Sequence, residues 1–119
     1  MKKITVNDLS VEEKLRLICA KGFWYTEDFG GKLPSVCVSD GPVGVRAERI
    51  DEKGEKYTAP SVAYPSIQLL ANTWSRECVK EMAGRLAEDC IEQNVDILLA
   101  PGVNIKRHPL NGRNFEYFS

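Results

Sequence analysis

Two groups of polar side chains follow short apolar runs and are the residues of this chain best suited to chemistry. Asp40 and Arg46 follow the run at residues 35–38. In α/β folds with parallel strands, the loops at the carboxyl ends of the strands converge, and binding groups gather there. A carboxylate accepts from two adjacent hydroxyls and a guanidinium donates to others, so the pair suits a neutral polyol. The second group follows the run at residues 95–100 and comprises Asn104, Lys106, Arg107, His108, Arg113 and Glu116.

Each of these groups also has a plainer interpretation. The Asp-Gly-Pro sequence that begins at Asp40 can simply form a turn in which the carboxylate bonds nearby amides. Arg113 can pair with Glu116 three residues later, and residues 106–108 can be a solvated basic cluster or a phosphate site. Residue types alone therefore leave the substrate open. Aromatic side chains that are candidates to cover the apolar face of a sugar are Trp24, Trp74, Phe115 and Tyr117.

The elements that must position these groups begin with a helix. The sequence SVEE at residues 10–13 has the form of a capping box, so a helix is predicted from Ser10 to about Cys19. Its apolar stripe consists of Val11, Leu15 and Ile18.

Two apolar runs predict strands. Residues 35–38 are apolar on both faces rather than alternating, as expected of a parallel strand that is covered on both sides, and residues 95–100 are interpreted as a second buried strand. Residues 46–60 are charged and rich in turn formers and predict an exposed loop, whereas residues 67–71 are too short to classify as helix or strand.

A long amphipathic helix is predicted between these strands, with Ser75 as the N-cap and Asn94 as the stop, and Met82 as one of its core side chains. The order of elements predicts an α/β fold in which right-handed crossovers join parallel strands.

Composition narrows the classes of partner. Sixteen Lys and Arg against seventeen Asp and Glu give a formal net charge of −1, which provides no overall basic field for nucleic acid or an anionic membrane. No apolar run approaches the roughly 20 residues that span a bilayer, and polar residues interrupt any signal-peptide core, so a cytoplasmic location is expected. Cys19, Cys37, Cys78 and Cys90 form no metal-binding or redox pair and are expected to be free thiols. Cys37 lies in an apolar run, and Cys78 and Cys90 lie in a helical pattern, so these three are expected to be buried.

Five blocks of sequence, in order along nearly the whole chain, resemble glycoside hydrolase family 3 enzymes of the β-glucosidase type. The last block ends in GRNFEYFS, and five ordered matches make chance resemblance very improbable. The blocks are residues 9–14 (LSVEEK), 38–46 (VSDGPVGVR), 64–65 (YP), 72–74 (NTW), and 99–107 (LAPGVNIKR) continuing through 112–119 (GRNFEYFS).

The resemblance implies that residues 1–119 are the first βα units of a (β/α)8 barrel, incomplete in this chain. Asp40 matches the family's aspartate that binds sugar hydroxyls, and Arg113 matches the arginine that contacts the same sugar in the −1 subsite. The family is retaining and exo-acting on terminal β-D-glucosidic or related bonds. The residues that match its nucleophile and its acid/base group lie outside this chain, so the chain holds no catalytic residue and by itself is expected to be inactive.

The resemblance also implies partners. They are a small-molecule glycoside or oligosaccharide, the remainder of the barrel, and a second α/β domain; no metal, organic cofactor, nucleic acid or membrane is expected. A barrel of this kind takes about 250 residues, so a few of its strands leave open edges and an uncovered apolar layer. The alternatives are a non-catalytic fragment that self-associates through such edges, and an anion-binding domain that uses Lys106, Arg107 and Arg113.

Overall fold

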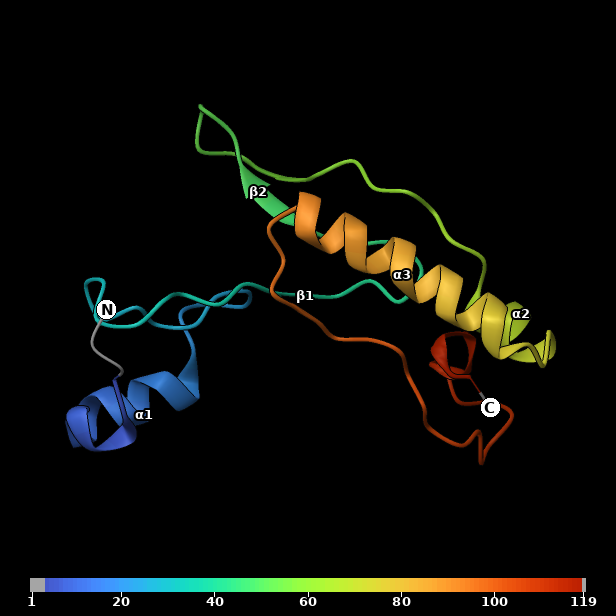
Figure 1. Cartoon of the computed structure of the whole chain (residues 1–119), viewed down its shortest axis with the longest axis horizontal. Coiled ribbons are helices and arrows are strands. Elements are labelled where there is room, and N and C mark those ends of the chain that lie inside the picture. The colour runs from blue at the N-terminus through green and yellow to red at the C-terminus, as the bar shows by residue number, and fades with distance from the viewer. Residues whose placement is uncertain (1–3, 119) are drawn as a thin grey trace. The chain divides into compact units, whose positions relative to one another are not determined.

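The computed structural model describes residues 4–118, which fold as two compact units divided after Val38 (Figure 1). Helices and short strands both contribute, so the predicted mixed α/β class is confirmed. Within residues 4–118 no helix combines the length and the apolar character needed to cross a bilayer.

The first unit contains a short 3-10 turn, η1 (Val6–Asp8), and helix α1 (Val11–Cys19). The predicted capping box is confirmed, because the Ser10 hydroxyl accepts from the Glu13 amide and the Glu13 carboxylate accepts from the Ser10 amide. Lys32 donates to the same carboxylate at 2.8 Å. The apolar stripe of α1 contacts little else in the described chain and remains exposed: Val11 (74%), Leu15 (59%) and Ile18 (83%).

The strand predicted at residues 35–38 is wrong in extent, because only β1 (Val38–Ser39) is a strand. Residues before it pair locally instead. The Thr26 amide donates to the Val36 carbonyl at 3.0 Å, and the Val38 amide donates to the Trp24 carbonyl at 2.7 Å. Antiparallel contact with a neighbouring segment therefore replaces the doubly covered parallel strand that the apolar run indicated.

The second unit begins within β1, at Ser39, and β1 is the hydrogen-bonded neighbour of β4 (Ile97–Leu98). The Leu99 amide donates to the Ser39 carbonyl at 2.8 Å. The prediction of a strand buried along residues 95–100 is wrong, because only Val95 is buried while Ile97 and Leu99 are about half exposed. The side chains of Ile97 and Leu99 are not covered by another described segment, and only two residues of the apolar run form a strand.

The loop predicted at residues 46–60 is a hairpin. Strand β2 (Glu48–Ile50) pairs antiparallel with β3 (Lys56–Thr58). The turn between them is organised by Asp51, whose carboxylate accepts from the Lys53 amide at 2.9 Å and the Glu55 amide at 2.8 Å. The predicted exposure was correct for β3, all of which faces solvent.

Residues left ambiguous in the sequence form helix α2 (Ile67–Asn72), which is capped by Ser66. The long helix is confirmed as α3 (Arg76–Glu92): the Ser75 hydroxyl accepts from the Cys78 amide, and Asn94 adopts a left-handed conformation just beyond the helix end. Tyr64 donates to the Asp89 carboxylate at 2.7 Å and ties the preceding segment to α3.

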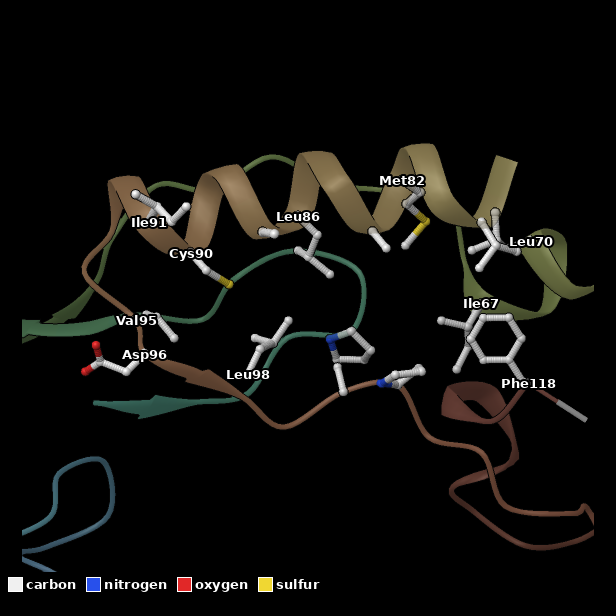
Figure 2. A pocket seen from close by; sticks show the side chains of 16 residues that line it. Ile67, Leu70, Met82, Leu86, Cys90, Ile91, Val95, Asp96, Leu98 and Phe118 are labelled. Carbon is white, nitrogen blue, oxygen red and sulfur yellow. The ribbon is translucent and has the colours of Figure 1, made fainter. Parts of the chain in front are cut away.

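The core of the second unit lies beneath α3 but is incompletely filled. Ile67, Leu70, Leu86, Cys90 and Val95 are buried, yet a pocket of about 430 Å³ remains between α3 and β4 (Figure 2). All four cysteines are free as predicted, and Cys37 and Cys90 are buried; Cys19 and Cys78 are exposed, so the expected burial of Cys78 is wrong. Cys78 lies in the first turn of α3, before the buried residues Leu86 and Cys90.

Candidate functional site

A small polar pocket in the second unit contains both predicted sugar-binding residues. Its volume is about 290 Å³. Asp40 reaches it from the segment after β1, and Arg113 reaches it from the segment before the 3-10 turn η2 (Asn114–Glu116). The complete lining consists of Asp40, Pro42, Leu99, Pro101, Gly102, Asn104, Arg113, Glu116 and Tyr117.

Asp40 is held in place by its backbone. Its carbonyl accepts from the Arg46 amide at 2.9 Å, and the buried Ser39 hydroxyl donates to the Arg46 carbonyl at 2.8 Å. Gly41 turns the chain at a φ of 129°, and an added Cβ there would lie 2.0 Å from the Gly44 carbonyl oxygen. The turn interpretation is thus correct for the backbone. The Asp40 carboxylate, however, forms no hydrogen bond or ion pair with any residue between 4 and 118.

The sequence allowed Arg113 either to pair with Glu116 or to face a ligand, and in the structure its side chain does the first while it lines the pocket. Its Nε donates to the Glu116 carboxylate, and both side chains line the pocket. This hydrogen bond and the charge of Glu116 raise the pKa of Arg113 above its ordinary value, with smaller contributions from Tyr117 and Asp40. Arg113 therefore remains cationic, and its terminal nitrogens can donate to a ligand.

Backbone pairing joins two of the segments that line the pocket. Gly102 forms a parallel bridge with Tyr117, and the Phe118 amide donates to the Gly102 carbonyl at 2.9 Å. A Cβ at Gly102 would meet the Glu116 carbonyl oxygen at 2.6 Å, so the two segments approach as closely as only glycine permits.

Several other predicted site residues lie outside this pocket. The guanidinium of Arg46 is 3.9 Å from the carboxylate of Glu48. The ring nitrogen Nδ1 of His108 accepts from the Leu110 amide at 3.2 Å. Lys106 and Arg107 do not line the pocket either. Of the four candidate aromatics, Tyr117 alone does so; Trp74 and Phe115 are 93% and 71% exposed, and Trp24 lies in the first unit beside Phe23.

Sequence reasoning missed Pro42, Leu99, Pro101 and Gly102 as lining residues. Pro101 and Gly102 directly follow the apolar run at residues 95–100, and no local pattern shows that Gly102 pairs with Tyr117 beside the pocket. As for metals, residues 4–118 contain no group of three or more His, Cys, Asp or Glu side chains that converge as ligands.

Comparison with known proteins identifies relatives of this chain. The family described as "Glycosyl hydrolase family 3 N terminal domain" matches residues 41–119, a range that includes Arg113 and starts just after Asp40. The whole chain is 44% identical to thermostable β-glucosidase B of Acetivibrio thermocellus and covers 16% of it. It is 37% identical, over 97% of its length, to an exo-α-(1→6)-L-arabinopyranosidase of Bifidobacterium longum, of which it also covers 16%.

Solved structures agree with these matches. The crystal structure of a β-glucosidase from Kluyveromyces marxianus in complex with glucose superimposes on 95% of this chain with a TM-score of 0.81 and 34% identity. The chain covers 13% of that protein, so it spans roughly one sixth or less of the relatives it matches. The resemblance inferred from the sequence blocks is confirmed: the chain belongs to glycosyl hydrolase family 3.

Proposed function

We propose that this chain supplies part of the −1 subsite of a retaining, exo-acting glycosidase that hydrolyses terminal β-D-glucosidic or related bonds. The observation that carries the proposal is the pocket in which Asp40 and Arg113 lie together. The relatives named as β-glucosidases support a terminal glucose unit as the substrate. The relative named as an arabinopyranosidase is the reason that the proposal includes related bonds.

The chemistry of the pocket suits one neutral sugar ring. The Asp40 carboxylate forms no hydrogen bond or ion pair with residues 4–118 and can accept from two adjacent hydroxyls. The Arg113 guanidinium, held through Nε by Glu116, donates to a further hydroxyl. A volume of about 290 Å³ is at the small end of ligand pockets, which favours a monosaccharide unit over a longer chain.

We further propose that residues 1–119 are the first βα units of a (β/α)8 barrel completed by other sequence. The exposed apolar stripe of α1 and the partly filled pocket beneath α3 support this, because the remainder of a barrel would cover such surfaces. In the proposed enzyme the nucleophile and the acid/base group come from those other segments, and the chain alone does not turn over substrate.

A chimera tests the proposal. This chain replaces the matching segment of the Acetivibrio thermocellus relative, and hydrolysis of a nitrophenyl β-D-glucoside is measured. Asp40→Ala is expected to lower kcat/KM about 100-fold, because it removes charge-assisted hydrogen bonds to the sugar. Asp51→Ala is the matched control, because that carboxylate accepts from amides of the hairpin turn and does not line the polar pocket, so the rate should be unchanged.

Two results would contradict the proposal. One is a chimera that keeps full activity after Asp40→Ala. The other is hydrolysis by the isolated chain that Asp40→Ala abolishes, since this would mean that a complete catalytic site lies within the chain.

A further inference from the structure

Gln68 links helix α2 to the segment that carries Arg113. Its side-chain nitrogen Nε2 donates to the Asn114 carbonyl at 2.9 Å and also to the Phe115 carbonyl. The two ends of this contact are separated by 46 and 47 residues in the chain. Gln68 is half-buried, does not line the polar pocket, and belongs to none of the sequence blocks that indicated the family.

The carbonyls that Gln68 contacts belong to η2, the turn between Arg113 and Tyr117. A 3-10 turn of three residues has poor hydrogen-bond geometry. Within η2 the Tyr117 amide donates to the Asn114 carbonyl at 3.5 Å, which is long for a hydrogen bond, so the contacts from Gln68 reinforce a weak turn. Arg113 is the residue before this turn and Glu116 is its last residue. Any rotation of η2 would therefore move both members of the ion pair that lines the pocket.

Two other contacts hold this segment, one made by η2 itself and one just after it. The Asn114 side chain donates to the His108 carbonyl at 2.9 Å, and the Phe118 amide donates to the Gly102 carbonyl. Gln68 supplies the contact from a regular helix, α2, which Ser66 caps and Ile67 and Leu70 bury in the core. The turn is thus attached to a helix that is packed into the core.

We propose that Gln68 is a positioning residue that fixes the Arg113 guanidinium in the pocket by clamping the η2 carbonyls to α2. The consequence for sugar affinity rests on the proposed function; the clamp itself does not. The contact requires two N–H donors on one atom at the end of a side chain of this length. Methionine preserves that length and removes both donors without adding charge, so Gln68→Met is the informative variant.

The test uses the full chain and two measurements. The first is the Arg113 side-chain N–H resonance in an ¹⁵N-labelled sample, identified by its loss in Arg113→Lys. Gln68→Met is expected to shift and broaden this resonance while the amides of Leu86 and Cys90 keep their positions. The second is the dissociation constant for glucose, which should rise about three- to tenfold, the range for one lost neutral hydrogen bond.

Controls separate positioning from general destabilisation. Gln93→Met removes a similar contact, in which the Gln93 side-chain amide donates to the Pro60 carbonyl at 3.3 Å. Neither Gln93 nor Pro60 lines the polar pocket, so this variant should change neither measurement. In the Arg113→Lys background, Gln68→Met should cause no further loss of glucose affinity, whereas a purely structural role would weaken binding equally in both backgrounds.

The outcomes are distinguishable. An unchanged Arg113 resonance in folded Gln68→Met overturns the inference, even if wild-type chain binds glucose. A shifted resonance in a chain that binds no glucose supports the clamp and counts against the proposed function. Equal effects of Gln68→Met and Gln93→Met would also overturn the inference.

Discussion

Gly102→Ala perturbs the close backbone contact on which the polar pocket depends. The new methyl group would lie 2.6 Å from the Glu116 carbonyl oxygen and 2.8 Å from a ring carbon of Tyr117. The first of these atoms belongs to the backbone and cannot rotate away, so the two segments must separate. Separation also weakens the hydrogen bond from the Phe118 amide to the Gly102 carbonyl.

The magnitude follows from these two effects. Forcing a methyl group into a filled space costs about 1–3 kcal/mol, and a lost backbone hydrogen bond adds about 1 kcal/mol. We therefore expect Gly102→Ala to cost about 2–4 kcal/mol. Because about 1.4 kcal/mol corresponds to a tenfold change, hydrogen-exchange protection of the Phe118 amide should fall about 30- to 1,000-fold.

Gly112→Ala provides the matched control in the same segment. An added methyl there meets no atom within 4 Å, so protection of the Phe118 amide should be unchanged. Unchanged protection in Gly102→Ala, or an equal loss in both variants, would refute the reasoning.

Two further predictions concern titratable groups. Hydrogen bonds from Lys32 and Ser10 lower the pKa of Glu13, so its contribution to stability is complete above the ordinary value of 4.5 and is lost as pH falls through the lowered folded value. Circular dichroism should show α1 unfolding in acid, at higher pH in Lys32→Met; identical midpoints would contradict this. The hydrogen bond to Asp89 raises the pKa of Tyr64 above 10.0, so ultraviolet titration should show a late-ionising tyrosine that Asp89→Asn shifts to lower pH; no shift would exclude that cause.

Helices α1 and α3 could be predicted because their signals are local, whereas the six residues of α2 were too few to classify. The capping oxygens of Ser10 and Ser75 lie within three residues of the amides they bond, so sequence spacing reveals them. The hairpin formed by β2 and β3 gave no such signal. Its strands are largely exposed and charged, so no alternating apolar pattern marks them, and the order created by Asp51 resembles an ordinary loop in sequence.

The site was predictable only in part. Asp40 and Arg113 were identified through the family's sequence blocks, and the structure brings both to one pocket, although sugar binding by them stays a prediction. The contributions of Gln68 and Gly102 depend on pairings with residues far along the chain, which no local pattern encodes. The strand expected at residues 95–100 was overestimated because an apolar run does not reveal which of its faces the same chain covers.

The distribution of thiols has a practical consequence. Each unit contains one exposed and one buried cysteine: Cys19 and Cys37 in the first, Cys78 and Cys90 in the second. Burial also raises the pKa of Cys90, which reduces its reactive thiolate. A maleimide spin label should therefore modify Cys19 and Cys78 selectively, giving one probe per unit without mutagenesis and allowing pulsed resonance measurements of the spacing between them.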